Sequence, residues 1–152
     1  MHSRICQLSQ KPIDKSDYIT EDMFYDDFVG TVGDYVQESP TGRKEDIEWL
    51  MAIIEDYGAI YNSSEESILF PIGFKENYFK ESYEKLKETV QNMSLEQFAS
   101  DSIIVSTLKL LIDSKYGFYI YTTHWQTLDN FVRCELKEGE KYYIGGILDY
   151  HF

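Results

Sequence analysis

The sequence predicts a single α+β domain over residues 1–152, in which a small, mostly antiparallel sheet of four or five strands packs with three to five helices. Three observations predict it. The length of 152 residues is that of one ordinary domain, long enough to bury roughly two-thirds of its unfolded surface. Hydrophobic residues make up 43% of the chain, which is too many for a disordered protein. Segments with the two-residue period of strands are mixed with segments that carry the three- and four-residue spacing of helices.

The first strand is predicted from residue 4 to residue 10, because its side chains alternate loosely and the following Pro12 cannot donate to a sheet. Residues 13–27 are polar and acidic, and we expect a long loop or a short, weak helix there. Residues 28–37 carry valines broken by two glycines. That pattern fits either an irregular strand or the approach to the next helix.

The best-marked helix is predicted to run from Pro40 to about Tyr57, with Ser39 as its N-cap and Gly58 as its stop signal. Between these signals the apolar residues recur at three- and four-residue spacing, as on one face of an amphipathic helix. They are Ile47, Leu50, Met51, Ile54 and Tyr57. Trp49 is flanked by this stripe, and we expect it in the core.

Short apolar runs at residues 59–61 and 68–70 are separated by a polar segment and closed by Pro71, which predicts a β-hairpin. A long helix is predicted from about Phe74 to Met93, because apolar residues alternate four- and three-residue steps there. They are Phe79, Tyr83, Leu86, Val90 and Met93. Two further helices are expected, one opened by a capping box at residues 94–97 and one capped by Asp101.

The last third of the chain predicts two strands with a short helix between them. Residues 118–122 are aromatic and β-branched, which indicates a strand buried on both faces. Thr127 is placed to cap a helix of one to two turns, from residue 128 to residue 135. Residues 141–152 predict a final strand, in which Gly145 and Gly146 indicate a bulge or the close approach of another backbone.

Acidic side chains are concentrated in one part of the chain. The formal net charge is −13, and residues 14–66 contain 15 acidic side chains against three basic ones. If these carboxylates share one side of the fold, their surface attracts basic proteins and repels nucleic acid and anionic membranes. The candidate partner-binding residues are Asp26, Asp27, Asp34, Glu45, Glu48 and Glu55, with Trp125 as either a core residue or an aromatic anchor. A surface that only keeps the protein soluble explains the same charges.

The chain lacks the motifs of several common enzyme classes. It has no phosphate-binding glycine loop, no C-x-x-C or H-E-x-x-H metal motif and no G-x-S-x-G nucleophile motif, so neither a cofactor nor a metal is expected. Asp149 and His151 lie two residues apart on the last predicted strand and therefore share a face. Together with His124 they are the candidates for the active site of a small enzyme or for a ligand-binding site.

The sequence also indicates a cellular setting. Cys6 and Cys134 are too few to form a disulfide framework and fit a reducing cytoplasm. The first twelve residues lack the apolar core of a secretory signal, and the longest aliphatic run, Leu50 to Ile54, is far shorter than a membrane span. We therefore expect a cytoplasmic protein that binds neither a membrane nor nucleic acid directly.

Three segments of the chain resemble one protein family. The opening MHSRICQLSQKPIDKSDYI, the middle GRKEDIEWL and the closing YYIGGILDYHF resemble an uncharacterised family of small acidic bacterial proteins found near mobile genetic elements. These segments cover about a quarter of the chain. The resemblance implies a bacterial, cytoplasmic setting, and it supplies no activity and no catalytic residue.

These observations together predict a non-enzymatic protein-binding or regulatory domain whose acidic face engages a basic partner. Its sharpest form is a nucleic-acid mimic, because carboxylates at three- and four-residue helical spacing approximate the spacing of phosphates along a strand. The alternatives are the small enzyme or ligand-binding domain, and a subunit whose apolar patch completes a homodimer.

Overall fold

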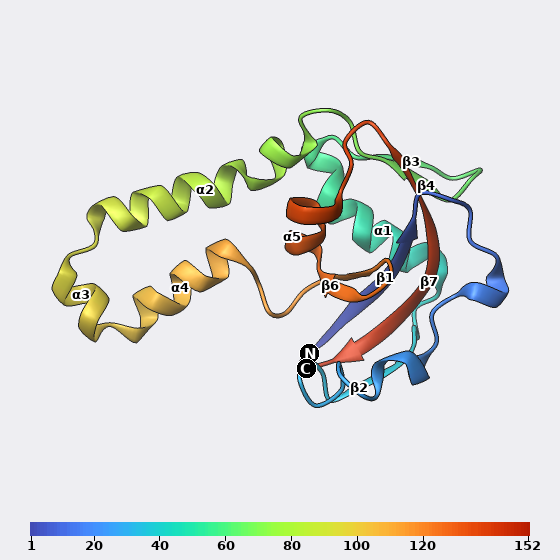
Figure 1. Ribbon diagram of the computed structural model, residues 1–152, viewed down its shortest axis with the longest axis horizontal. Coiled ribbons are helices and arrows are strands. Elements are labelled where there is room, and N and C mark those ends of the chain that lie inside the picture. Colours follow the sequence, from blue (N-terminus) through green and yellow to red (C-terminus); the bar gives the residue numbers. More distant parts are fainter.

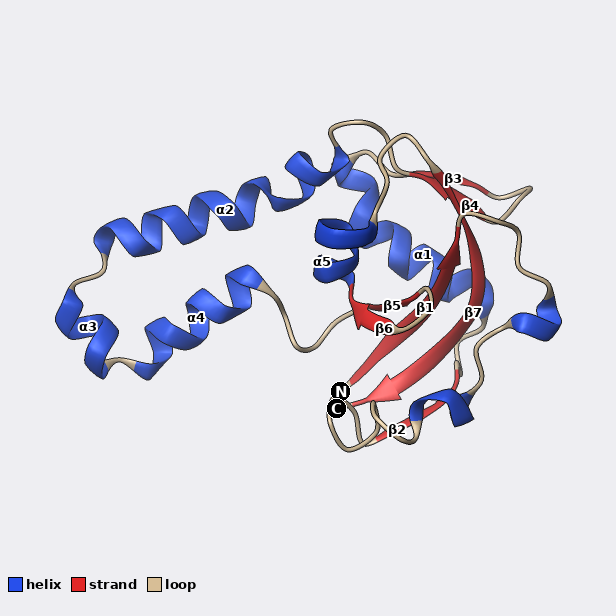
Figure 2. Ribbon diagram, in the orientation of Figure 1, coloured by secondary structure: helices blue, strands red, loops and turns tan.

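A helical arm projects from a body that contains the whole β-sheet, as the computed structural model of residues 1–152 shows (Figure 1). We define the body as residues 1–73 and 114–152, and the arm as residues 74–113. Helices and strands are mixed along the chain, so the predicted α+β class is confirmed (Figure 2). The expected sheet of four or five strands is too small, because seven strands are present and one of their pairings is parallel.

Two long antiparallel strands, β1 (His2–Ser9) and β7 (Lys141–His151), form the middle of the sheet. Along its other edge, β7 pairs with two strands in succession. Its first residues pair with β4 (Ser67–Leu69) and its last residues pair with β2 (Tyr35–Glu38). Residues 144–147 of this edge lie between the two pairings and have no strand beside them.

Three short strands complete the sheet, whose order is β3-β4-β7-β1-β5-β6 with β2 beside β7. They are β3 (Ile60–Asn62), β5 (Tyr119–Tyr121) and β6 (Trp125–Thr127). β3 and β4 form the predicted hairpin, and β5 runs parallel to β1. β6 is an addition to the expected strands.

Each face of the sheet has its own hydrophobic core, because successive side chains of β1 point to opposite faces. Cys6 and Leu8 belong to the larger core, which α1 (Arg43–Ile54) covers. Ile5 belongs to the smaller core, which the segment from Ile19 to Val32 covers. This segment contains one short 3₁₀ helix, Glu21–Phe24, in line with the loop or short helix predicted for residues 13–27.

Helix α1 begins three residues later than the sequence predicts. Gly42, with a φ of 88°, stands at its N-terminus and makes no side-chain cap. Ser39 is therefore not the N-cap, and its hydroxyl donates to Oδ1 of Asp46, 2.8 Å away. At the other end Gly58 adopts the left-handed conformation, as expected for a stop signal, after a 3₁₀ turn at Glu55–Tyr57.

Gly145 and Gly146 form a β-bulge opposite Gln7, and the backbone of Ile19 also lies close to Gly146, so both predicted alternatives are confirmed. The register of β7 against β1 shifts by one residue at this point. The backbone N–H of Gly146 donates to Oε1 of Gln7 at 2.9 Å. A Cβ atom on Gly146 would lie 2.9 Å from the backbone nitrogen of Ile19, so the covering segment leaves no room for a side chain there.

The arm contains three helices, α2 (Phe74–Asn92), α3 (Leu95–Ser100) and α4 (Ser102–Ile112). Both predicted caps are confirmed. Ser94 and Gln97 form a reciprocal capping box, and the Asp101 carboxylate accepts from the first amides of α4. Even α2, which has 19 residues, is too polar to cross a bilayer, and no other helix has the required length and apolar character.

The base of the arm is fixed to the short helix α5 (Leu128–Asn130), which continues as a π-helical turn over Phe131–Glu135. Thr127 caps α5, as the sequence predicts. The hydroxyl of Tyr78 on α2 donates to Oδ1 of Asp129 at 2.7 Å. The same carboxylate accepts from the backbone N–H of Ser114, where the chain leaves the arm.

Candidate functional site

A surface groove of about 790 Å³ runs along α1 beside β3. Five of its 11 lining residues are apolar, and they are Ile47, Met51, Ala59, Ile60 and Tyr61. Three carboxylates line the same groove, those of Glu48, Glu55 and Glu66. Two of them, Glu48 and Glu55, are among the partner-binding residues that the sequence predicts. The groove therefore combines apolar surface with negative charge.

The two cations at the groove differ in how firmly they are held. Arg43 pairs with Glu66 at 2.8 Å, donates to the backbone carbonyls of residues 144 and 145, and lies over the ring of Tyr18. The Arg43 guanidinium is thus held by Glu66 and by the edge of β7 that has no strand beside it. Lys44 is 3.7 Å from Glu48 and both side chains are exposed, so this pair is weak. Glu55 has no ion-pair partner.

Glu66 is the only non-glycine residue with a positive φ, at 48°. This left-handed conformation costs of the order of 1 kcal/mol for such a residue and persists where its surroundings hold it. Here Arg43 holds the carboxylate, and the N–H of Ile144 donates to the Glu66 carbonyl at 2.9 Å. The turn between β3 and β4 is fixed in this way at one end of the groove.

The six acidic residues of the predicted docking face are divided among three places. Glu45, Glu48 and Glu55 are exposed residues of α1 and its C-terminal turn, on one side of the sheet. Asp26 and Asp27 are exposed on the segment that covers the opposite side. Asp34 precedes β2 and lies 3.1 Å from Nδ1 of His151.

The two tryptophans occupy unlike environments. Trp125 packs edge-on against Phe28 and Tyr119 in the smaller core and is only partly exposed. Trp49 is 46% exposed, so its predicted place in the core is wrong. The guanidinium of Arg4 lies 4.8 Å from the centre of its ring. The helical spacing already separates position 49 from the buried stripe, because neither a three- nor a four-residue step joins it to Ile47 or Leu50.

A buried polar cluster lies where α1 meets β1 and β7. Arg4 donates to Oδ1 of Asp46 at 2.5 Å and also to Asp149, and all three side chains are buried. His2 and Gln37 contact the other oxygen of Asp149, at 2.9 and 3.1 Å. Oδ2 of Asp46 has no hydrogen-bond partner. The sequence analysis did not identify Arg4 as a member of a polar cluster. The only indication in the sequence is that a charged residue stands within a predicted strand.

The three residues of the alternative site do not come together. Asp149 and His151 share a face of β7, as their spacing predicts, and His2 pairs with His151 across the strands. His124 lies beyond Tyr121, which pairs with Gln7 at the far end of β1, and its Nε2 is 3.4 Å from Glu135. No group of three or more His, Cys, Asp or Glu side chains is placed to hold a metal ion.

The two thiols also lie apart. Cys6 is fully buried, and burial together with the nearby Asp46 charge raises the pKa of its thiol. It therefore stays protonated and is no nucleophile at neutral pH. Cys134 is exposed on the π-helical turn, with its sulfur 3.5 Å from Oδ1 of Asn130. Neither thiol contacts a histidine.

Comparison of the chain with protein-family models, with curated proteins and with solved structures gives no match.

Proposed function

We propose that this protein is a non-enzymatic protein-binding domain whose groove between α1 and β3 takes a basic, amphipathic segment of a partner. The observation that carries the proposal is the composition of the groove. Its lining joins five apolar side chains to the carboxylates of Glu48, Glu55 and Glu66. A volume of about 790 Å³ is sufficient for several side chains of a peptide.

The chemistry of such a groove favours lysine and arginine over other charged residues. Both have aliphatic stems that pack on apolar surface while their charged ends remain in water. The unpaired Glu55 and the loosely paired Glu48 accept hydrogen bonds from these ends. Apolar side chains on the other face of the same segment then fill the lining around Met51 and Ile60.

The nucleic-acid mimic is the narrower form of this proposal. It rests on Glu45, Glu48 and Glu55, which follow α1 on one side, whereas Asp26 and Asp27 lie on the opposite layer. A contact centred on α1 therefore uses half of the predicted acidic residues. We propose a cytoplasmic setting because the chain carries two free thiols. A bacterial origin near mobile elements rests on the resemblance of the three segments.

The experiment uses a fluorescent helical peptide with lysines on one face and leucines on the other. We expect binding in low salt that weakens at least fivefold between about 50 and about 300 mM salt, as ion pairs at an exposed site are screened. In low salt, the double variant Glu48→Gln/Glu55→Gln should bind the peptide more weakly than the wild-type chain does. The matched control is Glu84→Gln/Glu88→Gln on the arm, which makes the same change in net charge. Equal effects of the two double variants, or equal binding of a lysine–glycine peptide, would contradict the proposal.

A ligand-binding domain is the second candidate function, and one observation favours it. Asp46, whose Oδ2 atom has no hydrogen-bond partner, lines a hollow of about 410 Å³ together with Gly146 and Tyr18. A buried carboxylate oxygen without a partner favours a small ligand that donates a hydrogen bond, such as an amine. Screening of small amines by NMR, with Asp46→Asn as the comparison, tests this candidate. The absence of shifts around Tyr18 and Gly146 would remove it.

A further inference from the structure

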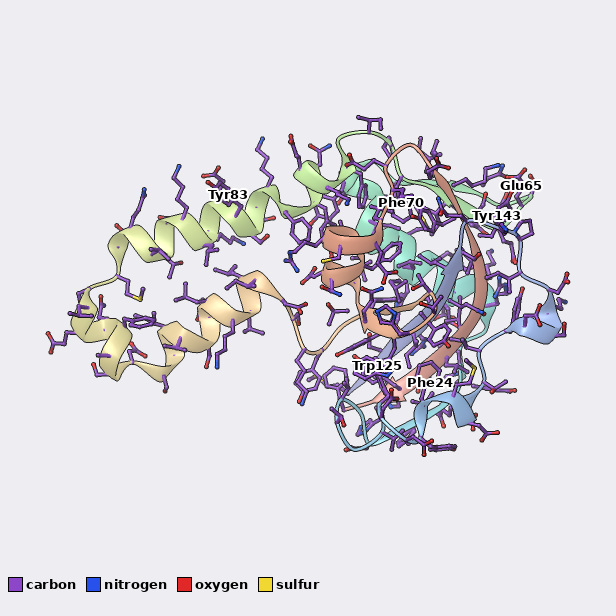
Figure 3. The ribbon with its side chains drawn as sticks, viewed as in Figure 1. Phe24, Glu65, Phe70, Tyr83, Trp125 and Tyr143 are labelled. Atoms are coloured by element: carbon purple, nitrogen blue, oxygen red, sulfur yellow. The ribbon has the colours of Figure 1, made fainter.

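The arm leaves much of its apolar surface uncovered. Its helices α3 and α4 contain no buried residue, and α2 contains only Phe74. Figure 3 shows Tyr83 on the arm, well away from the body, and this side chain is 60% exposed. Val90 and Ile112 are also more than half exposed, at 52% and 51%. Because α4 carries a single charge among its 11 residues, α2 alone cannot cover it.

Apolar residues repeat every seven positions in both long helices of the arm. In α2 and its C-cap residue Met93 the repeat is Phe79, Tyr83, Leu86, Val90 and Met93, with alternating four- and three-residue steps. In α4 it is Val105, Leu108 and Ile112. We call these two sets the seams. Such a repeat is typical of helices that pack along one another in bundles.

Within each seam some members face the other helix and some do not. Leu86 and Leu108 are partly covered, whereas Tyr83, Val90 and Ile112 are exposed. At 100° of rotation per residue, the exposed members of the two antiparallel helices turn to the same side of the arm. Two helices with seams turned in this way form half of a four-helix bundle.

We propose that the arm is a dimerisation element, and that the arms of two copies of this chain pack their seams about a twofold axis into a four-helix bundle. A twofold axis brings the same surface of both copies together, so each seam finds an identical apolar partner. This proposal does not depend on the groove, which lies on the body beside α1 and β3.

The distribution of charge favours a second copy as the occupant. Residues 74–113 contain five lysines against seven acidic side chains, whereas the whole chain has a net charge of −13. The arm is thus nearly neutral and projects from the body that carries most of the charge (Figure 1). Two copies can meet there without strong repulsion. A membrane is less suitable, because an anionic surface repels the chain and α4 has no row of basic residues.

The uncovered area is that of a weak dimer. Full burial of a leucine-sized side chain removes roughly 60–120 Å² of apolar area. Three of the eight seam residues are about half exposed and the other five are mostly covered, so the seams offer about 250 Å² of apolar area per copy. Since interfaces are about 60% apolar, this corresponds to a total of roughly 400 Å² per copy. Weak, transient complexes bury less than about 600 Å² per partner, so we expect the dimer only at high concentration.

The test is analytical ultracentrifugation of the full chain from about 1 to about 200 µM, a range that covers micromolar dissociation constants. We expect a dimer at the upper concentrations. Val90→Glu places a charge in the seam and should raise the dissociation constant more than about tenfold, since a buried unpaired charge is costly. Gln91→Glu makes the same charge change on the neighbouring exposed residue and should leave the dimer intact. Circular dichroism of both variants checks that the arm remains helical.

Three results would overturn the proposal. One is a wild-type chain that stays monomeric over the whole range. Another is an equal loss of dimer in Val90→Glu and Gln91→Glu while both retain their helix content, which would place the contact elsewhere. The third is flotation of the wild-type chain, but not of Val90→Glu, with neutral or anionic lipid vesicles, which would assign the seams to a membrane. The peptide-binding experiment is then repeated on Val90→Glu, so that loss of the dimer and loss of the groove are distinguished.

Discussion

Arg4 and Asp46 form an ion pair that is almost wholly removed from solvent, with Nε and Oδ1 2.5 Å apart. Arg4 belongs to β1 and Asp46 to the first turn of α1, so the pair connects the helix to the sheet. Asp149 on β7 accepts from the same guanidinium. Because a buried charge is tolerated only with a partner, these contacts connect the first turn of α1 to both central strands.

Asp46→Ala should destabilise the protein by about 3 kcal/mol, because it removes one of the two carboxylates paired with the buried Arg4 and leaves Nε of Arg4 and two hydroxyl donors without their acceptor. Urea unfolding followed by circular dichroism measures the change. Glu45→Ala removes an exposed carboxylate from the neighbouring position and should alter the free energy of unfolding by less than about 0.5 kcal/mol. Similar losses in the two variants would show that the buried pair has no special role.

Gln7→Leu should cost about 3 kcal/mol, because three backbone groups lose their hydrogen bonds to one buried side chain. Oε1 of Gln7 accepts from the amides of Ile19 and Gly146, and its Nε2 donates to the carbonyl of Asp17. Thermal unfolding measures the loss. Gln10→Leu changes an exposed glutamine just beyond β1 and serves as the control. If Gln7→Leu unfolds at the wild-type temperature, the bulge does not depend on this side chain.

Stability should fall at alkaline pH because of buried tyrosines. Burial, and then the charge of Asp129 and the hydrogen bond to it, raise the pKa of Tyr78 above its ordinary value of 10.0. The folded state therefore holds this proton more tightly than the unfolded state does. Its contribution is fully present below pH 10 and is lost as the pH rises further. Urea unfolding at a series of pH values should show this decline.

Tyr78→Phe should make the alkaline decline of stability less steep, because the substituted ring has no proton to lose. Tyr83→Phe is the matched control, since Tyr83 is an exposed residue of the same helix. Burial also raises the pKa of Tyr119, Tyr142 and Tyr150, so part of the decline should remain in both variants. An unchanged slope in Tyr78→Phe would contradict the assignment.

Amide hydrogens of α3 and α4 should exchange with solvent at least about a hundredfold faster than those of β1 and β7 in a dilute, monomeric sample. Helices α3 and α4 bury no side chain, and segments with few buried contacts open without global unfolding. Hydrogen–deuterium exchange with mass spectrometry resolves the two regions. Equal protection of the arm and the central strands in the monomer would show that the arm opens only with the body.

Local signals in the sequence predict most elements of this fold. The seven-residue spacing from Phe79 to Met93, the capping box at Ser94 and the hairpin before Pro71 each depend on neighbours within a few positions. The glycine pair of β7 also gives a local signal, because only a bulge or a close approach requires two residues without side chains.

Features that depend on distant partners are not predictable in this way. The strand β6 has only three residues, too few to show a periodicity in the sequence. It is a strand because it pairs with β5. Likewise Arg4 contacts Asp46 and Asp149 only after the sheet and α1 have formed. The groove unites Glu48 with Glu66 through the packing of α1 beside the β3–β4 turn, whereas the sequence indicates only that both are acidic.

The central strands set the order in which the chain can fold. In the ladder between β1 and β7, His2 pairs with His151. The middle of the sheet can therefore form only after the two ends of the chain have come together. Contacts between such distant residues make folding slow, whereas helices joined by short turns form within microseconds. The arm should therefore gain structure early while the body is still open, and a nascent chain would present its seams before its sheet is closed.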